Sequence, residues 1–185
     1  MANKIFYGVS NVYYAKITTA ADGTVTYGTP VAIPGCVGLN LDQEGEMNPF
    51  YADNIIYYQS TSNNGYPGTA EFAEIPDSFK TDILNEVADT NSVLVEKANV
   101  EPEEFALLFQ FEGDENAVKH SFLRCKCTRP SVASTTKEAS VTPGTISLNI
   151  SAMPRIKDQY VKLECKSGSA AYANWTSAVY EPTGL

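Results

Sequence analysis

The fold is decided by a stretch that reads Asn40-Leu-Asp-Gln-Glu-Gly-Glu-Met-Asn-Pro-Phe-Tyr-Ala-Asp-Asn-Ile-Ile-Tyr-Tyr58. A polar segment, Gln59–Gly65, a short apolar run, Tyr66–Ile75, and Pro76-Asp-Ser-Phe-Lys-Thr-Asp-Ile-Leu84 come next. The local signals are strand, loop, strand, tight turn, strand and helix. Nothing in the stretch resembles a nucleophile beside a base, a metal cage or a phosphate cradle. Composition and periodicity here predict a β-rich domain.

The beginning of this stretch predicts a strand with one apolar and one acidic side. The apolar side carries Val37, Leu39 and Leu41. If the strand runs on through Gly45, the other side carries Asn40, Asp42, Glu44 and Glu46. Such a stripe is usually the solvated side of an antiparallel sheet.

The rest of the stretch predicts a strand over Tyr51–Tyr58, a tight turn at Asn64-Gly65, a strand from Tyr66 toward Ile75 and then a helix. Asn and Gly favour the turn because both accept positive φ at low cost. Pro76 or Asp77 begins the helix. Its apolar side is expected to carry Phe79, Ile83, Leu84 and Val87, which recur at helical spacing.

The centre of the core is predicted in the second half of the chain. Phe105, Leu107, Phe109 and Phe111 alternate along one strand, and Glu112–Asn116 forms a hairpin loop. The return strand, Val118–Thr128, is expected to place Ser121, Leu123, Cys125 and Cys127 on one side. A further strand carries Ile146, Leu148, Ile150 and Ala152 inward. Tyr160–Cys165 is another candidate strand, and Ala170–Tyr180 is either a short helix or an aromatic arm around Trp175.

This count of eight or more short strands and one dominant helix predicts a mainly β sandwich or barrel with a flanking helix. A length of 185 residues fits a single domain over residues 1–185, with room for arms at either end. We find no run of 18 apolar residues and no signal-peptide pattern, so a cytoplasmic product is the default expectation.

Charge is distributed unevenly along the chain. The net charge is −9, with 18 acidic and 4 basic residues before residue 116 and 4 acidic and 9 basic residues after it. An acidic protein is a poor tight binder of nucleic acid. The asymmetry fits either a solvated acidic face or a subunit whose unlike faces meet head to tail.

Catalytic and metal-binding patterns are weak in this sequence. The chain has one histidine, His120, and four cysteines, which are expected to be buried or half-buried free thiols. The spacing from Asp42 to Glu46 does not match a calcium loop, and the glycines form no dinucleotide or phosphate-binding fingerprint. We therefore expect no catalytic residue, no metal and no cofactor.

Several blocks of sequence, read in order, carry a family resemblance. They are Tyr7-Gly-Val-Ser-Asn-Val-Tyr-Tyr-Ala15, Tyr27-Gly-Thr-Pro-Val-Ala-Ile-Pro-Gly35, Phe50-Tyr-Ala-Asp-Asn-Ile-Ile-Tyr-Tyr58, Asn63-Asn-Gly-Tyr66, Ile75-Pro-Asp-Ser-Phe79, Phe105-Ala-Leu-Leu-Phe-Gln-Phe-Glu-Gly-Asp114 and Thr128-Arg-Pro-Ser-Val-Ala133. The chain resembles the major tail protein family of siphophages and prophages of Gram-positive bacteria. The resemblance is least clear over Arg155–Leu185.

The resemblance implies a tail tube protein with a long stacking loop. Such proteins form hexameric rings that stack into a hollow tube, and the tube conducts phage DNA during ejection. A sheet from each subunit contributes to the inner barrel, and an acidic lumen repels DNA phosphates. The expected partners are copies of the chain itself, tape measure, tail terminator and distal tail proteins, and DNA in transient passage. The expected location is the virion tail, assembled in the host bacterial cytoplasm.

On this basis we predict two sets of site residues. Asp42, Glu44 and Glu46 are expected to face the lumen. Asn48, Phe50, Tyr51 and Asp53 are expected in the ring-stacking loop. The alternative function is an immunoglobulin-like surface binding module of a phage or cell, with the tyrosine-rich loops as its binding surface.

Overall fold

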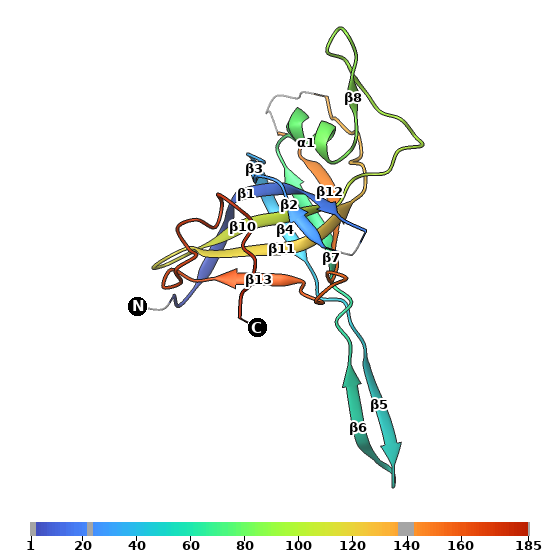
Figure 1. Ribbon diagram of the computed structural model, residues 1–185, viewed down its shortest axis with the longest axis vertical. Coiled ribbons are helices and arrows are strands. Elements are labelled where there is room, and N and C mark those ends of the chain that lie inside the picture. Colours follow the sequence, from blue (N-terminus) through green and yellow to red (C-terminus); the bar gives the residue numbers. More distant parts are fainter. Residues whose placement is uncertain (1–2, 22–23, 137–142, 185) are drawn as a thin grey trace.

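The longest strand, β1 (Phe6–Thr19), lies near one side of a large antiparallel sheet (Figure 1). The computed structural model describes residues 3–21, 24–136 and 143–184. The other strands of this sheet are β2 (Val25–Tyr27), β3 (Val31–Ala32), β4 (Cys36–Leu41), β7 (Tyr66–Phe72), β10 (Phe105–Gly113), β11 (Val118–Cys127), β12 (Ile146–Ala152) and β13 (Lys162–Cys165). Their order is β2-β1-β10-β11-β12-β7-β4, with β3 paired to β1 and β13 paired to β11. The mainly β class is confirmed.

The main core lies where the sheet curls and brings β1 against β4. Phe105, Leu107 and Phe109 of β10 point into it, as their alternation predicts, and Phe111 packs at its edge. Leu148, Ile150 and Ala152 of β12 also point inward. The predicted cores of these two strands are confirmed.

The single helix among the described residues, α1 (Asp77–Asp82), closes one side of this core. Phe79 is fully buried, with its ring edge-on to those of Tyr14 and Phe105. The helix is shorter than predicted: it ends at Asp82, with Ile83 as its C-cap, and the backbone turns at Asn85, which has φ of 57°. Val87 therefore does not belong to the helix. It begins a small hairpin formed by β8 (Val87–Ala88) and β9 (Leu94–Val95).

Two bulges change which side chains share a face. The register of β4 against β7 skips Val37, so this side chain is exposed and Cys36 packs against the core with Leu39 and Leu41. The second bulge shifts β11 against β10 between Phe105 and Leu107. As a result Cys125 and Cys127 lie on the main-core side, whereas Leu123 lies on the opposite side. The predicted grouping of these residues is wrong.

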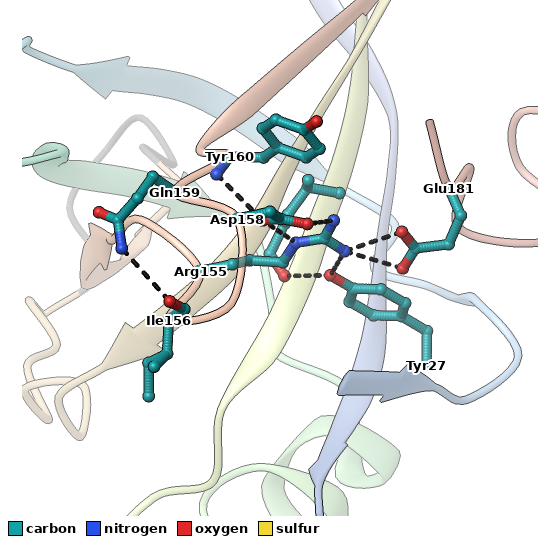
Figure 2. Close-up of polar contacts among 8 residues, drawn as sticks. Tyr27, Arg155, Ile156, Asp158, Gln159, Tyr160 and Glu181 are labelled. Atoms are coloured by element: carbon teal, nitrogen blue, oxygen red, sulfur yellow. Dashed lines mark hydrogen bonds and ion pairs between the residues drawn. The ribbon is translucent and has the colours of Figure 1, made fainter. Parts of the chain in front are cut away.

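The other face of β1, β10 and β11 is covered by the C-terminal segment, residues 166–184, where no helix or strand is present. Trp175 is 3% exposed, and its indole nitrogen donates to the carbonyl of His120 at 3.3 Å. The short helix, one of the two predicted forms, is absent from Ala170–Tyr180, and this part of the C-terminal segment packs on the sheet around Trp175. Near its end, Glu181 is held by Arg155 (Figure 2).

Arg155 is 5% exposed and joins three parts of the chain. Its Nη1 donates to Glu181 Oε1 at 2.8 Å and to the Tyr27 hydroxyl at 3.1 Å, and its guanidinium also pairs with Asp158. Burial opposes the charge on Arg155, but these partners raise its pKa above the ordinary value. Burial also raises the pKa of Tyr27 to about 12. The cluster thus fastens the C-terminal segment to β2 through a permanently charged group.

Candidate functional site

A two-stranded hairpin, β5 (Met47–Ala52) and β6 (Ile55–Thr61), projects far from the body of the molecule (Figure 1). It continues from β4 and β7 through an irregular ribbon. Asp42 N donates to Pro67 O at 3.0 Å, and Glu44 N donates to Gly65 O at 2.9 Å. A Cβ on Gly65 would lie 2.1 Å from the carbonyl oxygen of Ala152, and the residue has φ of +119°. Only glycine therefore fits where the ribbon leaves the sheet.

The tip of the hairpin is a two-residue turn at Asp53-Asn54. Ala52 pairs with Ile55, and both turn residues have positive φ, 51° and 63°. This is the geometry of a type I′ turn, whose twist matches that of paired strands. The prediction of one strand over Tyr51–Tyr58 is therefore wrong. The Asn64-Gly65 signal instead marks the return of the hairpin to the sheet.

Both faces of the hairpin carry large apolar side chains that remain exposed. Phe50 pairs with Tyr58, and Tyr51 pairs with Ile56 on the opposite face. The exposed set is Met47, Phe50, Tyr51, Ile55, Ile56, Tyr57 and Tyr58. An exposed apolar surface of this extent indicates a site of protein association.

The predicted stacking residues Asn48, Phe50, Tyr51 and Asp53 all lie in this hairpin and are exposed. The structure adds the returning strand β6, which the predicted strand over Tyr51–Tyr58 does not separate from the outgoing one. The signal that could have separated the strands is the pair Asp53-Asn54, because these residue types tolerate left-handed backbone.

The predicted acidic residues lie at the stem of the hairpin. Asp42, Glu44 and Glu46 are exposed, but β4 ends at Leu41 and does not run on through Gly45. Glu44 instead forms an isolated bridge with Gly65. Asn40 Nδ2 donates to Asp42 Oδ2 at 3.3 Å, which places these two side chains together.

This pair belongs to a polar face of β4, β7 and β12 that lies opposite the main core. Asn40 pairs with Thr69, and Thr69 pairs with Asn149, so the three side chains form a row across the strands. A groove of about 860 Å³ lies beside the row, lined by residues of β7, β12 and the end of β11. Lys126 in its wall is paired with Glu101 at 2.8 Å. The row itself carries amide and hydroxyl groups.

The histidine and the four cysteines, the side chains most suited to catalysis or metal binding, lie in packed surroundings. His120 is 9% exposed and stacks on Phe109 with ring centroids 5.4 Å apart, and burial lowers its pKa. Cys125, Cys127 and Cys165 are buried and Cys36 is half-buried, as predicted. Burial raises the pKa of Cys127 to about 12, which keeps it a thiol at neutral pH.

Within residues 3–21, 24–136 and 143–184, no group of three or more His, Cys, Asp or Glu side chains is arranged to hold a metal ion. Over the same ranges, no helix has the length and apolar character needed to cross a membrane.

Comparison with known proteins identifies the family. The chain matches no curated protein. A family model described as phage tail tube protein matches residues 1–114, a region that contains β1 to β10 and therefore the whole projecting hairpin. The match covers more than half of the 185 residues. The chain therefore belongs to the phage tail tube protein family.

Proposed function

We propose that this protein polymerises as stacked hexameric rings into the hollow tail tube that conducts phage DNA during ejection. The observation that carries the proposal is the β5–β6 hairpin, which projects from the body with apolar side chains exposed on both faces. We call the β5–β6 hairpin the arm. The arm does not stabilise a monomer, because its aromatic side chains remain in water. A copy in the next ring that receives the arm removes these groups from water. Asn48, Phe50, Tyr51 and Asp53 are accordingly proposed to make ring-to-ring contacts.

The arm also determines the symmetry of the contact between subunits of successive rings. A projecting element at one end must be received by a different surface on the neighbour, which is a heterologous contact. Such contacts repeat along an axis without limit, as a tube of stacked rings requires. The sixfold order comes from the family resemblance, and closure of each ring would cover free sheet edges such as that of β4.

We assign the lumen to the polar face of β4, β7 and β12, together with Asp42, Glu44 and Glu46 at the stem. The row of Asn40, Thr69 and Asn149 offers no cation to DNA phosphates, and the adjacent Lys126 is neutralised by Glu101. Exposed carboxylates beside this row repel phosphates, so the genome can slide without being held.

The lumen assignment is tested with the double variant Asp42→Lys, Glu44→Lys. Tubes are expected to form, and DNA is expected to bind inside them and to be ejected slowly. The matched control, Glu74→Lys with Glu115→Lys, changes the charge equally at exposed positions outside this face. Equal DNA retention and equal ejection rates in the two double variants would overturn the assignment.

The family places the protein in the tail of the virion, as a tube component that assembles with itself. We extend this to contacts with tape measure, tail terminator and distal tail proteins, and to assembly in the host bacterial cytoplasm. If the protein were instead an immunoglobulin-like surface binding module, it would be a stable monomer with a specific ligand. The two functions differ in whether the hairpin binds a copy of the chain or a foreign surface.

The deciding experiment is electron microscopy of the purified protein across a concentration series, with sedimentation of the same samples. Hollow tubes or stacked rings with sixfold symmetry are expected, either spontaneously or after addition of tube seeds. Monomers at every concentration that also fail to lengthen seeds would contradict the proposal.

A further inference from the structure

A second exposed apolar surface lies on the β8–β9 hairpin, away from β5–β6. Val87 pairs with Val95, and Asp89 N donates to Val93 O at 2.9 Å, so the antiparallel pairing extends to Val93. By the alternation of strands, the three valines share one face, and Leu94 points to the other. Val87, Val93 and Val95 are 53%, 56% and 42% exposed, whereas Leu94 is half-buried. We call these three residues the valine face.

This hairpin is a built element, because side chains fasten both its turn and its stem. At the turn, Asp89 Oδ1 accepts hydrogen bonds from the backbone of Asn91 and of Val93, each at 2.8 Å. These bonds lower the pKa of Asp89, so the carboxylate stays ionised and continues to accept both hydrogen bonds. Because the turn already fixes the backbone of the hairpin, the exposed valines can bind a partner without a large loss of conformational entropy.

The stem is held by Arg129, from the segment that follows β11. Arg129 Nη2 donates to the carbonyl of Val100 at 2.9 Å and to that of Lys97 at 3.3 Å, and its Nε lies 3.0 Å from Glu96 Oε1. Nη2 also donates to the carbonyl of Leu84 at 3.4 Å, and Leu84 precedes the β8–β9 hairpin in the chain. One guanidinium therefore joins the two ends of the segment that carries the valine face.

The position of the valine face indicates what covers it. Figure 1 is drawn with the longest axis of the molecule vertical, and it shows β8 at one end and the β5–β6 hairpin at the other. A shift of one copy along this axis brings its arm toward the valine face of the next. Both surfaces are apolar, and they are different, as a heterologous contact requires.

We propose that the valine face receives the β5–β6 hairpin of a second copy of this chain, in the neighbouring ring. The inference rests on the proposed stacking of rings and adds the surface that accepts the arm. Three half-exposed valines offer far less than the roughly 800 Å² per partner of a stable pairwise interface. A single contact is therefore weak, and the contacts act together when several copies in one ring engage the next ring at the same time.

The direct test joins the two surfaces covalently in assembled protein. A chain with Ile55→Cys near the arm tip and Val93→Cys on the valine face is prepared in a Cys36→Ser background, because the other three cysteines are buried. After assembly, a short bis-maleimide is added and the products are separated by denaturing electrophoresis. A ladder that extends beyond dimers is expected, because each chain links to two neighbours. Each single cysteine variant is expected to give no ladder.

The energetic test replaces the valine face by Val87→Ser, Val93→Ser and Val95→Ser. These side chains are exposed in the monomer, so thermal unfolding should change little. The concentration needed for tube assembly is expected to rise at least about tenfold, because three apolar contacts per copy are lost. The control, Val132→Ser with Ile156→Ser, replaces two exposed apolar residues elsewhere and should assemble normally.

The outcomes separate this inference from the function on which it rests. Tubes that form but give no ladder, or that form at an unchanged concentration when the valines are replaced, would overturn the valine face as acceptor and leave the tube in place. Unmodified protein that neither assembles nor lengthens seeds would overturn both.

Discussion

The proposed role of the arm can be tested by replacing one cross-strand pair, Phe50→Ser with Tyr58→Ser. These side chains are 60% and 64% exposed. With about 200 Å² per aromatic side chain, roughly 120 Å² of each remains in water in the monomer. Covering both at about 25 cal/mol per Å² would contribute up to about 6 kcal/mol per subunit, as an upper bound.

Even a contact that covers one third of this area stabilises assembly by about 2 kcal/mol per subunit. The critical concentration for tubes, measured by sedimentation, should therefore rise at least about 30-fold. The same change removes from the monomer only one exposed cross-strand pair, worth about 0.2–1 kcal/mol. Its melting temperature should fall by less than about 4 °C for a chain of this size.

Two results would refute this reasoning. A critical concentration equal to that of the unmodified protein would show that the arm does not enter the subunit contact. A large loss of monomer stability would show that the pair supports the fold, so that an assembly defect says nothing of a contact. Ile156→Ser, which replaces one apolar residue that is 63% exposed outside the arm, is the control.

Further variants test the core, the arm and the buried titratable groups. Phe79→Ala should lower the free energy of unfolding in urea by about 3–5 kcal/mol, because a fully buried ring leaves a cavity; a loss below about 1 kcal/mol would contradict the packing described. Gly65→Ala should destabilise the monomer and abolish assembly, because its Cβ would lie 2.1 Å from the carbonyl of Ala152; normal tubes from this variant would mean that the ribbon leaves the sheet differently. Arg155→Gln should expose the C-terminal segment to limited proteolysis at a stability cost of about 1–3 kcal/mol, since its carboxylate partners are partly exposed; unchanged cleavage would argue against a fastening role. His120 has a pKa lowered from 6.5 by burial, so the unfolded chain binds its proton first and stability should fall as pH drops below 6.5. His120→Phe should remove this part of the pH dependence in urea titrations, and a retained slope would assign it to other groups.

The strands that sequence analysis predicted well are those with uninterrupted alternation. In β12, apolar and polar residues alternate through the whole strand, so the inward set follows from residue type. In β10, Phe105, Leu107 and Phe109 recur at period two, but Leu108 on the opposite face is also buried, beneath the C-terminal segment. In β4 and β11 a single extra residue reverses the alternation part-way. In β4 the bulge lies directly before Gly38, and a glycine inside a strand is a local mark of a bulge. In β11 the bulge depends on how the partner strand is paired, and no glycine or proline marks it.

The errors in the central stretch have a local physical cause. Asn64-Gly65 has the stronger turn signal, but the tip of the arm is at Asp53-Asn54, a pair that adopts left-handed backbone less commonly than Asn-Gly. The predicted helix reaches Val87 because apolar spacing continues past Asp82, where α1 ends, and the left-handed backbone at Asn85 then turns the chain away. The C-terminal segment could be predicted only in outline, because Trp175 packs through tertiary contacts without regular structure.

The same details indicate how the arm avoids uncontrolled association. An isolated two-stranded ribbon has two free edges, and free edges template pairing with other chains. In this arm Pro49 has no N–H to donate to an added strand, and Asp53 at the tip and Glu46 at the stem place negative charge at both ends. Strand addition is thus disfavoured along the arm, while Phe50 and Tyr58 on one face and Tyr51 on the other remain available. Association through side-chain faces depends on the shape of the receiving surface, whereas edge pairing accepts almost any extended chain. We therefore expect the arm to select a neighbour that presents a matching apolar surface, and the valine face is such a surface.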